Sequence, residues 1–250
     1  MGGGQTMGSL ASEKHFWDIH SHVLPNIDDG SGDWETTMKM MELSEKAGVM
    51  TIVATPHYEP WGEPLDKGRI FALCQEASGR YREKTGREVR VLPGNELYFH
   101  SDIVSDLRSG KALTLNGSDT VLVEFTPMTG FGVISRGLAD IRAAGYEVIL
   151  AHVERYECLR KVKDGVDRLL DAGVLLQSNI SEAGGGFFDS TTGWLKKLYK
   201  QERISFTASD MHGVEHRRPM SKEDQDKLLR FVSEDYLQAL LRWNAKRYLL

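Results

Sequence analysis

Asp18-Ile19-His20-Ser21-His22 lies at the end of the first apolar run of the chain and decides how the rest of the sequence is interpreted. Residues 16–19 are typical of a short buried strand. Side chains two residues apart on a strand point to the same face, so His20 and His22 would project together from its end. Two imidazoles in this arrangement suit a metal ion, although an isolated pair of histidines is more often structural. The later strands decide between these two interpretations.

Apolar runs rich in β-branched residues alternate with helical patterns over the whole chain. After the first run, the predicted strands are residues 51–55, 89–92, 120–123, 148–151, 174–179 and 204–208. The predicted helices occupy residues 33–48, 65–85, 134–145, 159–172, 194–199 and the stretch from residue 221 onward. Strand–helix alternation predicts an α/β fold with a parallel sheet. About seven repeats without a glycine-rich dinucleotide motif favour a closed or nearly closed (β/α) barrel in one domain.

Composition argues against several classes of function. The chain of 250 residues is 40% hydrophobic and 27% charged, which is ordinary for a globular protein. Its net charge of −5, without a block of basic residues, argues against a nucleic-acid partner. Two cysteines, Cys74 and Cys158, cannot form a disulfide framework and indicate a reducing compartment. Without a transmembrane run or a secretory signal, we expect a cytoplasmic protein that does not insert into membranes.

The first 14 residues differ in composition from the rest. They are rich in glycine, and we expect a flexible leader over residues 1–14 followed by a single domain over residues 15–250. The opening Met1-Gly2-Gly3-Gly4-Gln5-Thr6 formally fits a myristoylation pattern, but so short a pattern matches easily by chance.

Side chains that bind metals end nearly every predicted strand. In a barrel of this kind the C-terminal strand ends meet at one rim, where active sites are built. Six strand ends and the first loop carry histidine or carboxylate side chains: His20, His22, Asp29, His57, Glu96, Glu124, His152, Asp210 and His212. So many carboxylates in a partly dry pocket would be unfavourable without cations. The joint pattern therefore predicts a site for several metal ions.

The chemistry of these ligands narrows the choice of metal and substrate. Imidazole and carboxylate without thiolate suit Mn²⁺, Fe²⁺ or Zn²⁺ rather than a structural zinc site. Four carboxylates facing three divalent ions would leave a formal charge of about +2. That local charge suits a phosphate substrate, even in a chain of negative net charge.

Six stretches are together specific enough to identify a resemblance. They are residues 18–30 (DIHSHVLPNIDDG), 54–57 (ATPH), 94–98 (GNELY), 123–125 (VEF), 151–156 (AHVERY) and 208–212 (ASDMH). In order and spacing they closely resemble the bacterial manganese-dependent protein-tyrosine phosphatases of the polymerase-and-histidinol-phosphatase (PHP) superfamily, the CpsB/YwqE type. The resemblance extends from about residue 15 to residue 220.

The resemblance implies a distorted, TIM-like (β/α)7 barrel of the PHP type that holds three manganese ions. By position, the ligands of the first ion would be His20, His22, Glu96 and Asp210. Those of the second would be Glu124, His152 and Glu96, which bridges to the first. Those of the third would be Asp29, His57 and His212.

The implied function is hydrolysis of phosphotyrosine on a protein, with a bacterial tyrosine autokinase that controls capsule or exopolysaccharide synthesis as substrate. Two arginines would grip the phosphate: Arg155 and either Arg217 or Arg218, a choice that the sequence leaves open. We hypothesise that a hydroxide bridging two ions attacks phosphorus in line with the tyrosine oxygen. For the proton donor to the leaving group, His22, Asp210 and a metal-coordinated water remain open.

Residues near the ligands allow further expectations. Gln177 and Asn179 end the sixth strand with amides, and we expect them to hydrogen-bond to metal-bound carboxylates or water. Tyr58, Trp61 and Phe131 lie on loops that follow strand ends, where they could stack on a substrate ring or simply pack within the loops.

One motif points to a different chemistry. Residues 74–80 fit C-x5-R, the signature of cysteine-dependent tyrosine phosphatases. That signature needs free backbone N–H groups that cradle the phosphate at a helix start. Because Cys74 lies inside a helical pattern, we interpret the match as a coincidence.

Three other functions fit parts of the pattern. A related PHP-type phosphoesterase would act on histidinol phosphate or on nucleic-acid ends, and the acidic charge balance disfavours the latter. A metal-dependent amidohydrolase also begins with H-x-H, but we find no lysine at a strand end to bridge its metals. A non-catalytic binding protein with structural metals is disfavoured because every ligand position carries a competent side chain.

Overall fold

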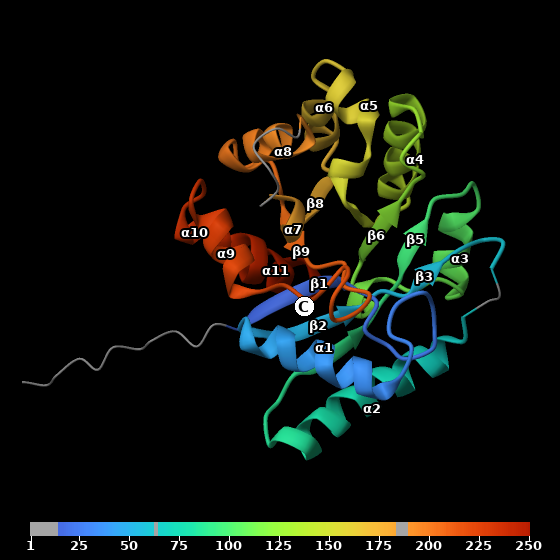
Figure 1. Cartoon of the computed structure of the whole chain (residues 1–250). Coiled ribbons are helices and arrows are strands. Elements are labelled where there is room, and N and C mark those ends of the chain that lie inside the picture. Colours follow the sequence, from blue (N-terminus) through green and yellow to red (C-terminus); the bar gives the residue numbers. More distant parts are fainter. Residues whose placement is uncertain (1–14, 63–64, 184–189) are drawn as a thin grey trace, which may run out of the picture.

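Parallel strands curl around a common axis, and helices cover their outer side (Figure 1). The computed structural model describes residues 15–62, 65–183 and 190–250, and the predicted leader over residues 1–14 lies outside these ranges. One sheet contains, in this order, β1 (Phe16–Ser21), β2 (Val49–Ala54) and β4 (Arg90–Pro93). The other contains, in this order, β3 (His57–Tyr58), β5 (Glu96–Tyr98), β6 (Thr120–Glu124), β7 (Glu147–Leu150), β8 (Leu175–Asn179) and β9 (Phe206–Ala208).

The two sheets approach each other on both sides. On one side β2 leads into β3, and β4 into β5, through breaks of two residues each. On the other side β9 continues along β1, where the Asp210 N–H donates to the His20 carbonyl and the His22 N–H donates to the Met211 carbonyl, each at 2.9 Å. The result is a curled parallel half-barrel, in agreement with the predicted strand–helix alternation.

Helices and short turns connect successive strands. In chain order they are α1 (Trp34–Lys46), α2 (Lys67–Thr85), α3 (Ile103–Ser109), η1 (Leu115–Gly117), α4 (Phe131–Ala143), η2 (Val153–Arg155), α5 (Glu157–Lys161), α6 (Gly165–Asp171), α7 (Ile180–Ala183) and α8 (Ser190–Lys200). The predicted cap of the first helix is confirmed, because the Asp33 side chain accepts a hydrogen bond from the Thr36 N–H. The predicted stop of α2 is also confirmed: Gly86 adopts the left-handed conformation that ends many helices.

The predicted helix over residues 159–172 is wrong as a single element. It is divided into α5 and α6 at residues 162–164, where Asp164 has a φ of 55°. Leu159 and Leu169 are buried in the same core on either side of this break, so the apolar spacing runs through it and conceals it. The helix α3 and the two short strands β3 and β5 are too brief to leave a periodic pattern in the sequence.

Apolar side chains pack in two layers. The larger core lies between the strands and the outer helices, whereas a smaller one fills the inside of the curl and includes Trp17, Ile19 and Phe206. The C-terminal elements are α9 (Lys222–Leu229), α10 (Glu234–Gln238), the π-helical turn η3 (Ala239–Trp243) and α11 (Asn244–Leu249). Leu249 packs into the inner core, and Thr120, the first residue of β6, donates its hydroxyl to the Tyr248 carbonyl at 2.8 Å. The helix α11 therefore closes the end of the curl where the strands begin.

The opposite end, where the strands finish, is left for polar side chains. Among the described residues, no helix combines the length and the apolar character needed to cross a membrane.

Candidate metal centre

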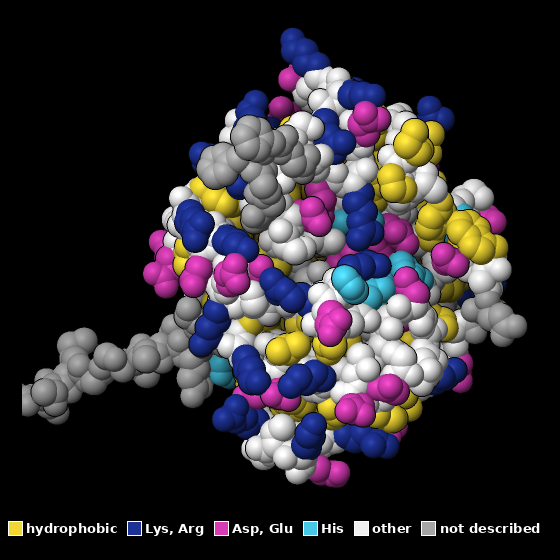
Figure 2. Space-filling view, viewed as in Figure 1, with side chains coloured by type: hydrophobic (Ala, Val, Ile, Leu, Met, Phe, Trp, Pro, Cys, Tyr) yellow, Lys and Arg dark blue, Asp and Glu magenta, His cyan; other side chains and the backbone are white. Residues whose placement is uncertain are grey.

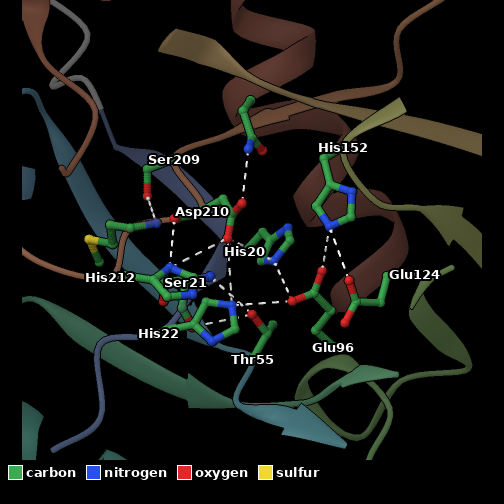
Figure 3. A network of polar contacts seen from close by, with 12 residues as sticks. His20, Ser21, His22, Thr55, Glu96, Glu124, His152, Ser209, Asp210 and His212 are labelled. Carbon is green, nitrogen blue, oxygen red and sulfur yellow. Dashed lines mark hydrogen bonds and ion pairs between the residues drawn. The ribbon is translucent and has the colours of Figure 1, made fainter. Parts of the chain in front are cut away.

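The nine predicted metal ligands converge at the C-terminal ends of the strands. Figure 2 shows histidine and carboxylate side chains gathered at the middle of this face, with arginine or lysine side chains beside them. Among the described residues, three groups offer ligand atoms that all lie within 4.8 Å of one another: His20, His22, Glu96 and Asp210; His22, Asp29, His57 and His212; and His57, Glu96 and Glu124. His152 joins them, since its Nε2 lies 2.7 Å from Glu96 Oε1 and 3.5 Å from Glu124 Oε2 (Figure 3).

The pairing of β1 with β2 aims the first two histidines. Ser21 lies between them and turns away from the centre, since its hydroxyl donates to the Val53 carbonyl at 2.8 Å. Its N–H donates to Thr55 Oγ1 at 3.0 Å. His20 and His22 therefore share the opposite face, as the alternation of side chains on a strand requires, with ring centroids 5.6 Å apart.

Glu96 stands at the middle of the cluster. Its Oε2 lies 3.1 Å from His20 Nε2, 3.2 Å from His22 Nε2 and 3.2 Å from His57 Nδ1. Donor atoms around an ion with bonds of about 2.1 Å are separated by about 3.0–3.4 Å, so these spacings fit shared coordination. Only 1% of the Glu96 residue is exposed, so water cannot replace such a partner.

A second part of the cluster lies nearer the solvent. Asp29 Oδ1 is 3.4 Å from His57 Nε2 and 3.3 Å from His212 Nε2. The other ring nitrogen of His57 lies 3.2 Å from Glu124 Oε1. His57 therefore stands between two groups of ligands, whereas the resemblance assigns it to one ion only.

Buried ligand atoms without hydrogen bonds test whether cations fit here. Five such atoms face the centre: His20 Nε2, His22 Nε2, His57 Nδ1, His212 Nε2 and Glu96 Oε2. A buried polar atom without a partner is unfavourable by roughly 1–3 kcal/mol. Because these atoms are nitrogen and oxygen donors at coordination spacing, divalent cations would satisfy all of them together.

Protons compete with cations for the same atoms. Burial lowers the pKa of His22, but the hydrogen bond to Asp28 and the negative charges of Asp28 and Glu96 outweigh it and raise the pKa to about 10. The pKa of His152 is likewise raised to about 9, because hydrogen bonds to Glu124 and Glu96 outweigh burial. A metal ligand must be neutral imidazole, so cation binding releases these protons and becomes stronger as the pH rises.

Supporting side chains hold the ligands from behind. Gln177 contacts two histidines instead of the predicted carboxylate or water: its Oε1 accepts from His20 Nδ1 at 3.2 Å and from the His152 N–H at 2.8 Å. Asn179 Nδ2 donates to Asp210 Oδ2 at 2.9 Å. With its Nδ1–H given to Gln177, His20 presents Nε2 to the centre.

Two supporting aspartates were not predicted from the sequence. Asp28 Oδ2 lies 2.6 Å from His22 Nδ1, which leaves the other ring nitrogen to the centre. Asp18 accepts from the Ser209 N–H at 3.0 Å and from the Ser209 hydroxyl at 2.5 Å, and its burial raises its pKa to about 6. Both aspartates lie inside the first motif. The sequence does not show whether such a side chain points toward the metal centre, as a ligand, or toward the back of a ligand, as a support.

Two ligands have an unusual backbone. His152 has a φ of 30° and Asp210 a φ of 53°, in the left-handed region that residues other than glycine seldom adopt. The hydrogen bond to Gln177 holds the first, and the two hydrogen bonds from Ser209 to Asp18 hold the loop of the second. Such strain is maintained where the surroundings require it, typically at functional sites.

Gly30 makes the close approach of the first loop possible. A Cβ at this position would overlap the carbonyl oxygen and the Cβ of His22. We expect Gly30→Ala to lower the free energy of unfolding by about 1–3 kcal/mol and to reduce the divalent metal bound per chain. Gly32→Ala is the control, since a Cβ there meets nothing within 4 Å. Metal analysis and thermal unfolding check both, and equal behaviour of the two variants would contradict the steric argument.

The structure distinguishes Arg217 from Arg218, a choice that the sequence leaves open. Arg155 Nη2 lies 2.6 Å from Asp210 Oδ2, and Arg217 Nη2 lies 2.6 Å from Asp210 Oδ1. Arg218 turns away and binds both oxygens of Asp224, at 2.8 and 3.0 Å. Only Arg155 and Arg217, of these three, therefore reach the centre.

The three aromatic residues considered from the sequence differ in their surroundings. Tyr58 is buried and donates its hydroxyl to Asp106 Oδ2 at 2.8 Å, and Phe131 is buried in the larger core. Tyr58 and Phe131 therefore pack within the protein and are not available to stack on a substrate ring. Trp61 is 64% exposed and lies against Tyr98.

Cys74 is buried within α2. Burial raises the pKa of its thiol to about 12, so it carries no thiolate at neutral pH. Arg80 lies on the surface, where it pairs with Glu76. The C-x5-R match is therefore not a phosphate-binding loop.

A curled parallel sheet whose strands end in histidines and carboxylates defines an α/β protein with a candidate centre for several metal ions. The chain belongs to the CpsB/CapC family: a family model described as "Capsular polysaccharide synthesis, CpsB/CapC" matches residues 16–250.

Named relatives cover nearly the whole chain. The tyrosine-protein phosphatase CpsB of Streptococcus agalactiae is 29% identical over 93% of this chain and 97% of its own length. The tyrosine-protein phosphatase YwqE of Bacillus subtilis is 30% identical over 82% of this chain and 81% of its own.

Solved structures show the same architecture. One chain from the crystal structures of YwqE from Bacillus subtilis and CpsB from Streptococcus pneumoniae, described as unique metal-dependent tyrosine phosphatases, superposes with a TM-score of 0.83. It is 27% identical, with 93% of this chain and 94% of that chain covered. A histidinol phosphate phosphatase from Lactococcus lactis, at 14% identity, a TM-score of 0.53 and coverage of 87% and 93%, shares the fold alone.

Proposed function

We propose that this chain is a metal-dependent protein-tyrosine phosphatase. The observation that carries the proposal is the position of Glu96, one oxygen of which faces three histidines at coordination spacing. Two guanidinium groups at the edge of the same cluster add the cationic partners that a phosphate ester needs. The activity named for the relatives of this chain supports the same assignment.

The metal ligands that we propose are His20, His22, Asp29, His57, Glu96, Glu124, His152, Asp210 and His212. We propose Mn²⁺ as the ion and three ions as the full complement, with Fe²⁺ or Zn²⁺ as substitutes, since the donors are nitrogen and oxygen only. When bound, such ions lower the pKa of coordinated water and neutralise the charge that develops on a phosphoryl group.

Arg155 and Arg217 are our candidates for binding the phosphate. Both reach the Asp210 carboxylate from the open side, and their exposed fractions of 36% and 39% leave them accessible to a ligand. The planar guanidinium binds two phosphate oxygens at once, which suits the equatorial oxygens during in-line displacement. Arg218 is already engaged with Asp224, so we assign it a structural role.

The proton donor to the tyrosine oxygen is not Asp210 in this proposal. Burial raises its pKa, but interactions with His20 and with the guanidinium groups of Arg155 and Arg217 outweigh burial and hold the pKa well below its usual range. His22 already shares a hydrogen bond with Asp28 through Nδ1. A phenolate is a fairly good leaving group, so we propose departure without help from either side chain.

We also infer that residues 15–250 form one domain with seven strands in its barrel. The breaks between β2 and β3 and between β4 and β5 each span two residues, which supports treating each pair as one interrupted strand. Counted in this way, the nine strands that the described part of the chain forms correspond to the seven of a (β/α)7 barrel.

The proposed substrate in the cell is a phosphorylated tyrosine on a bacterial tyrosine kinase that controls capsule or exopolysaccharide synthesis, and the proposed location is the cytoplasm. The capsular polysaccharide description of the family supports this choice.

Metal analysis and a phosphatase assay test the proposal together. The purified protein should contain divalent metal, hydrolyse a phosphotyrosine peptide with Mn²⁺ and lose this activity with a chelator. Histidinol phosphate, tested at the same concentration, should be turned over more slowly. A metal-loaded protein that hydrolyses only histidinol phosphate would show the alternative small-molecule phosphatase, and one without turnover of either substrate would contradict the proposal.

Cys74→Ser separates the metal mechanism from the cysteine mechanism. We expect the variant to keep its activity within about twofold, because the buried thiol lies in α2, belongs to none of the ligand groups, and is replaced by a serine that adds only a small polar change. Initial rates on p-nitrophenyl phosphate provide the measurement, with His57→Ala as the inactive comparison. Abolished activity in Cys74→Ser, together with a native melting curve, would contradict the metal mechanism.

A further inference from the structure

An exposed tryptophan packs against a tyrosine beside the candidate metal centre. The ring of Trp61 meets that of Tyr98 edge to face, with centroids 4.6 Å apart and planes at 72°. Such contacts are a favoured geometry for aromatic pairs. Trp61 nevertheless keeps 64% of its surface in water, so the pair leaves one aromatic face open.

The strand register places this pair directly over the metal ligands. Tyr98 is two residues beyond Glu96 on β5, so both side chains leave the same face of the strand. On the neighbouring strand β6, the residue opposite Tyr98 is Glu124. Tyr98 therefore stands one step nearer the solvent than Glu96 and beside Glu124, at the mouth of the site.

Trp61 lies at the mouth of the candidate metal centre and not in the hydrophobic core. It follows His57, a proposed ligand, by four residues and directly precedes Gly62, which lines a hollow together with Asp29 and His57. A fully packed loop would bury so large an apolar ring, as happens to Tyr58 on the same segment. Exposed aromatic side chains beside a polar site are characteristic of ligand binding.

We propose that Tyr98 and Trp61, here called the aromatic wall, bind the ring of an aryl phosphate and give the site its preference for aryl over alkyl esters. This inference rests on the proposed function. A phosphate held between Arg155, Arg217 and the metal ligands would direct its ester group toward the wall, since Glu124 belongs to the cluster and lies beside Tyr98. The ring would then gain an aromatic contact that an alkyl group cannot make.

Two competitive ligands that differ only in the ring test the wall. Phenylphosphonate and methylphosphonate present the same anionic group and cannot be hydrolysed. In calorimetric titrations of the metal-loaded protein, we expect Trp61→Ala to weaken phenylphosphonate by about three- to tenfold and to change methylphosphonate by less than twofold. Trp61→Phe should restore most of the lost affinity, because it keeps an aromatic face.

Trp243→Ala is the matched control. Trp243 is also an exposed tryptophan, at 50%, but it lies on η3, at the closed end of the curl. We expect this variant to bind both phosphonates as the parent protein does.

In steady-state kinetics, Trp61→Ala should raise KM for p-nitrophenyl phosphate while kcat stays within about twofold.

Specific outcomes would contradict the proposed role of the aromatic wall. Equal weakening of both phosphonates would mean that Trp61 supports the centre rather than the ring. Unchanged binding of phenylphosphonate would show that the ring lies elsewhere, and if phosphotyrosine is still hydrolysed, the proposed function survives without the wall. Absence of phosphotyrosine hydrolysis in the metal-loaded parent protein would overturn both.

Discussion

Glu96→Gln is expected to lower kcat/KM for a phosphotyrosine peptide by on the order of a thousandfold. Loss of a side chain that only supports a metal ligand typically costs about 10–100-fold, and Glu96 faces three histidine ligands directly. Glutamine has the same shape but carries no charge, so the shared position between His20, His22 and His57 would lose its anion. The amount of bound metal per chain should fall at the same time.

The control for this variant is Glu147→Gln, which removes a carboxylate from the beginning of β7, away from the centre. Glu147 pairs with Arg142 at 2.8 Å in a partly exposed ion pair, whose loss should change the free energy of unfolding by less than about 1 kcal/mol. Activity and metal content should be those of the parent protein. A Glu96→Gln protein with full metal content and full activity would refute the shared position.

Arg217→Ala and Arg218→Ala should differ widely although the residues are neighbours. We expect Arg217→Ala to reduce kcat/KM by about 10²–10³-fold, because it removes a cation aimed at the developing phosphoryl charge. Arg218→Ala should leave kcat/KM nearly unchanged, since its guanidinium binds Asp224, the residue that also completes the cap of α9 through Ser221. Its effect should be a lower melting temperature.

Steady-state kinetics and thermal unfolding of the two variants provide the measurement. Arg217→Lys adds a further comparison, because lysine keeps the charge but cannot bind two oxygens of one phosphate. It should recover only part of the lost rate. If Arg218→Ala were the inactive variant while Arg217→Ala kept its activity, the proposed phosphate site would have to be redrawn around Asp224.

The strand ends could be predicted because their signal is local. Each of His57, Glu124 and His152 follows a strongly apolar, β-branched run, and parallel strands bring such positions to the same rim. The supporting amides could be found for the same reason, since Gln177 and Asn179 end a strand in the same register.

What could not be predicted depends on contacts between distant segments. The choice between Arg217 and Arg218 follows from the positive φ of Arg217 and from the ion pair between Arg218 and Asp224. Neither is visible in a pattern of residue types. Asp28 and Asp29 are adjacent and chemically alike, yet the fold turns one toward the back of His22 and the other toward His57 and His212. Periodicity also conceals the break in the helical stretch around Asp164.

The proposed ligands span the chain from His20 to His212, a separation of 192 residues (212 minus 20). At a synthesis rate of roughly 5–20 residues per second, the first histidines emerge from the ribosome roughly 10–40 seconds before the last. Until β9 reaches β1, the nascent chain exposes an incomplete set of imidazoles with little selectivity among cations. Selective loading is therefore expected only after residue 212 has been released and its segment has paired with β1.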